Sequence, residues 1–121
     1  MGYLSEVVIV LNKAGIEELD KKLAELPDGE DKECVIHCLD TMANRYRSGA
    51  FELLQWRSIK WYSNYDGYRG ASLLNGLIYN ITYSNYRFIR VGEEYDDVEM
   101  RGGLYNNPFD VRVERTIRFE I

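Results

Sequence analysis

The chain has 121 residues, of which 45% are hydrophobic and 29% charged, and its net charge is −5. These values are typical of one globular domain, and no apolar run approaches the roughly 20 residues that a membrane-spanning helix requires. Glu6 interrupts the apolar run near the N-terminus, so we expect no secretory signal and no membrane contact. Two cysteines fit a reducing compartment, and we predict a single cytoplasmic domain over residues 1–121.

The first predicted strand and helix follow each other directly. Residues 3–11 contain the apolar run Val7–Leu11, which is typical of a central strand buried on both faces. Asn12 can cap a helix that follows, in which four apolar residues recur at helical spacing: Ile16, Leu19, Leu23 and Leu26. Pro27-Asp28-Gly29 ends this pattern, so we expect an amphipathic helix that covers the sheet.

Residues 31–49 are ambiguous. Five residues suit one helical face, namely Val35, Cys38, Leu39, Met42 and Tyr46, and Gly49 suits a helix C-terminus. We therefore predict a helix. A short strand at 34–38 is the alternative, because periodicity cannot distinguish helix from strand in so short an apolar run.

The middle of the chain predicts a strand, a turn and a further helix. Residues 51–62 are rich in residues that favour strands, but their alternation changes phase between Leu53 and Trp56, which a bulge or strong twist would repair. Turn residues follow at 63–67. Four apolar residues then indicate a helix, Leu74, Leu77, Ile78 and Ile81, although Gly70 and Gly76 weaken it.

Two more strands are predicted at 86–92 and 109–121. In the second, six odd positions are apolar and would line one buried face: Phe109, Val111, Val113, Ile117, Phe119 and Ile121. Together the segments predict an α+β domain with an antiparallel sheet of about four to six strands and two or three helices on one face. The ferredoxin-like arrangement is the nearest familiar architecture.

Three stretches of the sequence are similar to known proteins: MGYLSEV at 1–7, WRSIKWY at 56–62 and FIRVGEEYDDVEMRG at 88–102. Together they resemble a group of small uncharacterised proteins encoded by bacteriophages and prophages. The resemblance carries no catalytic residue. It implies a bacterial host cytoplasm, where small acidic phage proteins often bind and block host proteins.

Two residue groups have the composition of metal sites. Cys34, His37 and Cys38 offer ligands that Zn²⁺ accepts, but the chain has no further Cys or His for a fourth position. We expect buried thiols there. The acidic cluster of Glu93, Glu94, Asp96, Asp97 and Glu99 has oxygen ligands for a divalent cation, but not the spacing of a known loop. If residues 94–100 form a strand, Asp97 and Glu99 share a face. We expect neither a metal nor a cofactor.

Ten tyrosines and two tryptophans are the most distinctive feature of the composition. Exposed aromatic side chains are enriched at protein interfaces. We therefore predict a non-enzymatic module that binds a bacterial host protein, as a phage accessory or counter-defence factor, and leave homo-oligomer formation open. The predicted contact residues are aromatic or acidic: Trp56, Trp61, Tyr62, Tyr65, Tyr68, Glu93, Glu94, Tyr95, Asp96, Asp97 and Glu99.

Two alternative functions follow from other residues. The basic, tyrosine-rich middle of the chain suits single-stranded nucleic acid, with phosphates contacted by Arg57, Lys60, Arg69, Arg87 and Arg90. The net negative charge disfavours this alternative, because binding to nucleic acid depends on neutralising phosphates. A metal-assisted enzyme at the acidic 93–99 cluster is the third hypothesis.

Overall fold

A computed structural model describes residues 4–61, 69–93, 97–109, 111 and 113. Its helices and strands follow in the order β1 (Ser5–Leu11), α1 (Lys13–Glu25), α2 (Glu30–His37), the π-helical turn η1 (Cys38–Met42), β2 (Asn44–Ser48), β3 (Phe51–Ile59), α3 (Arg69–Tyr79), the 3₁₀ turn η2 (Tyr83–Asn85), β4 (Tyr86–Val91) and β5 (Val98–Arg101). Among these residues no helix has the length and apolar character needed to cross a membrane.

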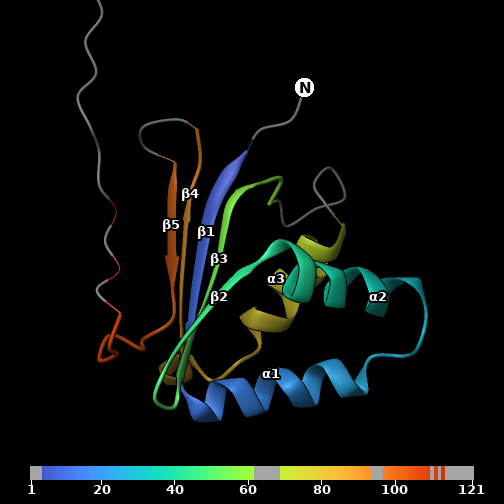
Figure 1. The fold of residues 1–121 in the computed structure, drawn as a ribbon, viewed down its shortest axis with the longest axis horizontal. Coiled ribbons are helices and arrows are strands. Elements are labelled where there is room, and N and C mark those ends of the chain that lie inside the picture. Colours follow the sequence, from blue (N-terminus) through green and yellow to red (C-terminus); the bar gives the residue numbers. More distant parts are fainter. Residues whose placement is uncertain (1–3, 62–68, 94–96, 110, 112, 114–121) are drawn as a thin grey trace, which may run out of the picture.

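The strands form one five-stranded sheet in the order β2-β3-β1-β4-β5, and each pair of neighbours is antiparallel. The three α-helices lie on one face of this sheet (Figure 1). The first four strands and the helices between them have the split β-α-β order of the ferredoxin-like arrangement, to which β5 adds an edge strand. The predicted α+β architecture is confirmed.

The main core lies between the sheet and the helices. It joins alternate residues of β1 to α1, α2 and α3, and its largest fully buried side chains are Trp56 and Phe88. The Trp61 ring lies 5.1 Å from that of Trp56 and 6.0 Å from that of Phe88. At the end of β1, Asn12 accepts a hydrogen bond from the Gly15 amide at 2.8 Å and caps α1, as predicted.

The register of β3 explains its irregular sequence pattern. Ser5 pairs with Ile59 and Val7 with Trp56, so two positions on β1 match three on β3. The extra residue restores the alternation, because Ile59 then shares the helix-covered face with Trp56. The predicted irregularity exists, but it follows Trp56. Leu53 lies out of phase because it faces the opposite side of the sheet.

The prediction of one helix over residues 31–49 is correct only for its first part. The chain is helical through α2 and η1 and then continues as strand β2. Tyr46 therefore lies on a strand instead of a helix face, and its side chain is 48% exposed. Gly49, with φ of +62°, begins the two-residue loop between β2 and β3. Glycine at positive φ suits both a helix C-terminus and a hairpin turn, so the sequence alone could not show that Gly49 ends a strand instead of a helix. The alternative strand at 34–38 is also wrong, because these residues are helical.

The second face of the sheet is covered in part by the chain that follows β5. Leu104 packs with Val10 and Leu53 in a small second core, against which Phe109 and Val111 also pack. The strand predicted at 109–121 is not observed where the structure describes the chain, since Phe109, Val111 and Val113 belong to no strand. Its other residues lie outside the described part.

Candidate functional site

The two tryptophans predicted to contact a partner are core residues. Trp56 is 2% and Trp61 3% exposed. The indole N–H of Trp56 donates to the carbonyl of Cys38 at 3.0 Å, and that of Trp61 donates to Asn75 Oδ1 at 3.3 Å. They therefore stabilise the fold and present no ring to a partner. Six other predicted contact residues lie outside the described part of the chain: Tyr62, Tyr65, Tyr68, Glu94, Tyr95 and Asp96.

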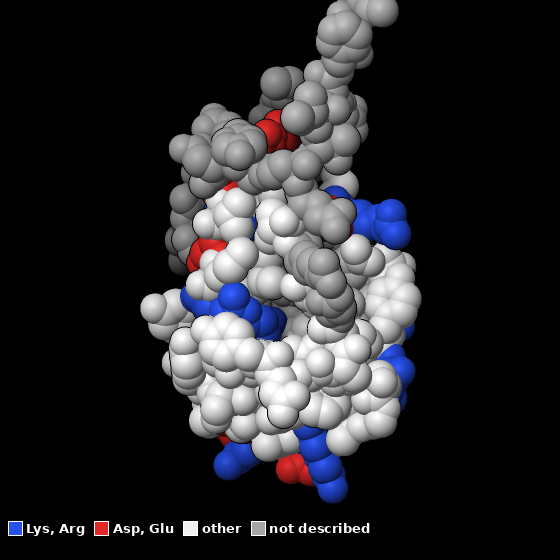
Figure 2. Space-filling model, turned by 90° about the vertical axis from the view of Figure 1, so that its left-hand side faces the viewer, with Lys and Arg blue, Asp and Glu red and all other residues white. Residues whose placement is uncertain are grey.

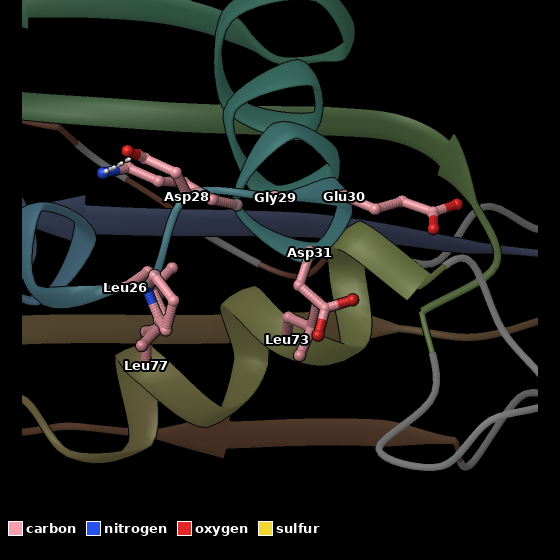
Figure 3. A pocket seen from close by; sticks show the side chains of 9 residues that line it. Leu26, Asp28, Gly29, Glu30, Asp31, Leu73 and Leu77 are labelled. Carbon is pink, nitrogen blue, oxygen red and sulfur yellow. Dashed lines mark ion pairs between the residues drawn. The ribbon is translucent and has the colours of Figure 1, made fainter.

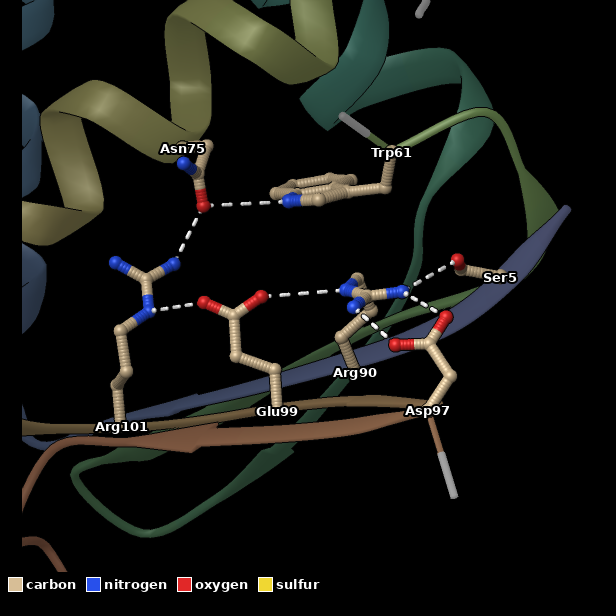
Figure 4. A network of polar contacts seen from close by, with 7 residues as sticks. All are labelled: Ser5, Trp61, Asn75, Arg90, Asp97, Glu99 and Arg101. Atoms are coloured by element: carbon tan, nitrogen blue, oxygen red, sulfur yellow. Dashed lines mark hydrogen bonds and ion pairs between the residues drawn. The ribbon is translucent and has the colours of Figure 1, made fainter. Parts of the chain in front are cut away.

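Asp97, which directly precedes β5, and Glu99 on β5 lie on the same side of the chain, as expected, and both contact Arg90 of β4 (Figure 4). Arg90 donates to Asp97 at 3.1 and 2.7 Å, to Glu99 at 3.2 Å and to Ser5 Oγ at 3.2 Å. The hydrogen bonds to Asp97 raise the pKa of Arg90. The two acids are thus engaged by Arg90 within the fold, which leaves Glu93 as the exposed described member of the predicted acidic surface.

Arg101 extends this network to α3. Its Nε lies 3.1 Å from Glu99 Oε2, and its NH2 donates to Asn75 Oδ1, the same oxygen that accepts from Trp61 (Figure 4). The guanidinium lies 4.2 Å from the centre of the Phe88 ring. Neither Asn75 nor Arg101 was predicted from the sequence. Their role depends on the packing of α3 against β5, which no local pattern reveals.

The Cys34, His37 and Cys38 group does not form a metal centre in the structure. Cys38 is fully buried, and desolvation raises the pKa of its thiol to about 12. The thiol therefore stays protonated at neutral pH, as expected for a buried structural cysteine. Among the described residues no three potential metal-binding side chains come together.

The basic residues predicted for nucleic acid do not share one surface. Arg69 holds Asp31 through two hydrogen bonds of 2.7 and 3.0 Å, and Arg90 is bound to Asp97 and Glu99 on the helix-covered face. Arg87 lies on the opposite face of β4, while Arg57 and Lys60 are exposed at the end of β3. They form no continuous track for a phosphate backbone.

A different group of exposed side chains lies around the end of β5, with Tyr79 and Arg101 on the helix-covered face of the sheet and Tyr105 and Arg87 on the opposite face. Of the large apolar and aromatic side chains that the structure describes, the most exposed are Tyr105 at 69%, Tyr79 at 66% and Tyr83 at 64%. The Arg101 guanidinium lies 4.8 Å from the centre of the Tyr79 ring, and that of Arg87 lies 4.8 Å from the centre of the Tyr105 ring. We call these five residues the tyrosine–arginine cluster.

The backbone holds the cluster in place. The amide of Gly103 donates to the carbonyl of Tyr83 at 2.7 Å, and Arg87 donates to the carbonyl of Gly102 at 2.9 Å. A Cβ at Gly103 would lie 2.5 Å from the Tyr83 ring, so a larger residue there would displace the ring from its present position. A hydrogen bond to Tyr105 raises the pKa of the Tyr83 hydroxyl and joins the two rings. The adjacent glycines 102 and 103 were the sequence signal for this close packing.

The surroundings of the cluster carry few charges. Figure 2 shows the side of the molecule formed by β5 and the chain after it, where uncharged surface dominates and basic side chains are more prominent than acidic ones. A pocket of about 300 Å³ lies on this side, with Arg87, Met100 and Tyr105 in its wall. Arg87 and Tyr105 therefore border a hollow, largely uncharged face, whereas Tyr79 and Arg101 lie on the helix-covered side of the sheet.

Comparison with models of protein families finds no match to this chain. Comparisons with curated proteins and with solved structures also find no match at the required significance. The function is therefore inferred from the geometry of the residues above.

Proposed function

We propose that this chain is a non-enzymatic protein-binding module whose contact surface is the tyrosine–arginine cluster. The observation that carries the proposal is that the three most exposed tyrosines among the described residues all lie around the end of β5. Tyrosine and arginine are the residue types that dominate the binding energy of protein interfaces. This surface replaces the one predicted around Trp56 and Trp61, because those rings are buried.

Preorganisation supports the proposal. Each tyrosine in the cluster is restrained before any partner binds: Tyr79 by Arg101, Tyr83 by the Gly103 backbone and Tyr105 by Arg87. A surface restrained in this way loses less conformational entropy on binding than a set of free side chains. Met100, which accepts a hydrogen bond from Arg87 at 3.4 Å, adds an adaptable apolar contact beside the rings.

The proposed partner is a bacterial host protein, met in the cytoplasm of an infected cell. This part of the proposal rests on the resemblance of the three sequence stretches to phage and prophage proteins, and it includes an accessory or counter-defence role. Glu93, the exposed described member of the predicted acidic surface, lies at the opposite end of the β4–β5 hairpin and so stands apart from this contact.

Single-stranded nucleic acid is the second candidate. The stacking of the Arg87 guanidinium on the Tyr105 ring favours it, because exposed rings and arginines can also stack nucleobases. Of the five basic residues predicted for this function only Arg87 belongs to the cluster, and the net charge of −5 repels phosphates. Protein binding is therefore the better supported function.

The test is recovery of a partner from a bacterial lysate on immobilised protein. We expect the wild type to retain a specific protein and the double variant Tyr79→Ser/Tyr105→Ser to lose about 90% of it, because removal of interface anchors commonly costs over 1 kcal/mol each. Tyr46→Ser is the matched control, since Tyr46 is also exposed but lies on the far edge strand β2.

Equal recovery by the double variant and the wild type would contradict the proposal, provided that circular dichroism shows both to be folded. A gel shift with labelled oligothymidylate at low salt separates the second candidate. A shift that disappears in the double variant and at high salt would support nucleic-acid binding instead.

A further inference from the structure

A groove opens on the helical side of the molecule, beside α3. It has a volume of about 400 Å³ and lies between α3 and the connection from α1 to α2. Figure 3 shows its floor, formed by Leu26 after α1 and by Leu73 and Leu77 of α3. We call it the leucine groove.

The floor of the groove is a row of apolar side chains that pack against the main core on one side and are exposed to the groove on the other. Leu73 and Leu77 are four residues apart on α3, so they lie on the same helix face one turn apart. Both are half-buried and pack against the main core, as does Leu26. Their remaining surface faces the groove, where an apolar side chain of a partner would remove it from water.

The rim of the groove is acidic. Three carboxylates line it, those of Asp28, Glu30 and Asp31, against a single ammonium, that of Lys32. Lys32 lies 3.5 Å from Asp28, and Arg69 neutralises Asp31 through two hydrogen bonds. Counting Arg69, three negative charges face two positive ones. The neighbouring chain adds to the negative side, because residues 12–33 contain eight acids and four bases.

We propose that the leucine groove binds a basic amphipathic segment of a partner protein. One apolar side chain of the segment enters between Leu26, Leu73 and Leu77, and a Lys or Arg beside it pairs with Glu30 and Asp28. The volume of the groove falls within the range of about 300–1,000 Å³ that is usual for binding pockets. An apolar helix face flanked by basic residues is a common ligand of such grooves.

Charge disfavours the other occupants. The carboxylates of Asp28 and Glu30 repel fatty acids, phosphates and anionic membranes. A second copy of this chain carries a net charge of −5 and would bring like charges together. A cationic segment is the occupant that both the floor and the rim favour.

The test is fluorescence anisotropy with a labelled helical peptide of leucines and lysines. We expect the wild type to bind it, and Asp28→Lys/Glu30→Lys to bind at least about tenfold more weakly, because the two charge reversals convert attraction into repulsion. Both residues are exposed, so the variant should remain folded. Glu17→Lys/Asp20→Lys is the matched control: it makes the same charge change on exposed residues of α1 outside the groove, and we expect less than about a twofold effect.

Two further measurements distinguish groove binding from charge attraction alone. A peptide with serine in place of leucine should bind at least about tenfold more weakly, and the methyl NMR signals of Leu73 and Leu77 should shift with the leucine peptide. No binding to the wild type, equal loss in both charge variants, or equal affinity for both peptides would overturn the proposal. Tyr79→Ser/Tyr105→Ser should bind the peptide normally, so the two proposed surfaces can fail separately.

Discussion

Arg90 on β4 and Asp97, the residue before β5, form a two-pronged ion pair, with N–O distances of 3.1 and 2.7 Å. The backbone closes the same turn, since the amide of Gly92 donates to the carbonyl of Asp97 at 2.8 Å. The Arg90 side chain is only 15% exposed, so water screens the pair weakly. A carboxylate that the sequence suggested for partner binding thus holds the edge strand in place.

Replacing Asp97 should therefore destabilise the protein. We expect Asp97→Asn to lower the free energy of unfolding by about 1–3 kcal/mol, because it leaves a largely buried guanidinium with a weaker partner. Urea denaturation measures the change. Glu93→Gln is the control, because Glu93 is exposed and accepts a hydrogen bond from the Leu4 amide, and its effect should stay within about 0.5 kcal/mol. Similar urea midpoints for Asp97→Asn and the wild type would show that the Arg90–Asp97 pair contributes little to the free energy of unfolding.

The glycines of α3 and of the chain after β5 should respond in opposite ways to alanine. At Gly76, an exposed position in α3, an added Cβ meets nothing within 4 Å. Gly76→Ala should raise the stability by about 0.4–1 kcal/mol, because alanine favours the helix and restricts the unfolded chain. Thermal and urea unfolding measure this gain.

Gly102→Ala serves as the opposite case. Gly102 has φ of +86°, and a Cβ there would lie 2.1 Å from the carbonyl oxygen of Tyr86. We expect a loss of more than about 1 kcal/mol and a disturbed tyrosine–arginine cluster. If Gly76→Ala destabilised the protein instead, α3 would have to pack on that side against something that the described residues do not include.

The sequence predicted the elements whose local signals and burial agree. The apolar run of β1 and the Asn12 cap of α1 each have one interpretation, and the structure confirms both. The strand at residues 44–48 was not predicted, because Arg45 and Arg47 break the alternation of apolar and polar residues that marks a strand. They are held in β2 by Glu52 on the adjacent strand, at 2.9 and 3.3 Å. Such pairing between strands cannot be read from either segment alone.

The site was harder to predict than the fold because exposure depends on tertiary packing. Trp61 and Tyr105 are both aromatic residues near the end of a strand, yet one is buried under α3 and the other is exposed. The sequence suggested that Asp97 and Glu99 belong to a free acidic surface, but the pairing of β4 with β5 places Arg90 beside both carboxylates. The pair of glycines at 102 and 103 was the one sequence feature of the site that indicated a close approach between the backbone and other residues.

Glu18 on α1 should make stability depend on pH. Its carboxylate accepts hydrogen bonds from Asn85 Nδ2 at 2.9 Å and from the Thr82 amide and hydroxyl at 3.1 and 2.8 Å. These bonds, that from Asn85 above all, lower the pKa of Glu18 below its ordinary value of 4.5. The contribution is therefore present above pH 4.5 and is lost as the pH falls through the pKa of the folded state.

We expect Glu18→Gln to cost about 1 kcal/mol at pH 7 and less at pH 3, because the wild-type carboxyl is increasingly protonated as the pH falls. Urea titrations at the two pH values measure both differences. Glu17→Gln is the control, because Glu17 is an exposed neighbour on the same helix. A deficit of the Glu18 variant that is the same at both pH values would show that its charge does not matter.

The thiol of Cys38 should be unreactive in the folded protein. The side chain is fully buried below Trp56, and burial raises its pKa to about 12, so the thiolate that alkylating reagents attack is scarce at pH 8. Cys34, four residues earlier, is only half-buried.

In Cys34→Ala, which retains Cys38, we expect iodoacetamide labelling to be at least about a hundredfold slower than in denaturant, since access then requires unfolding. In Cys38→Ala, which retains Cys34, the difference should be much smaller. Rapid labelling of Cys38 in the native protein would mean that α2 and η1 open readily.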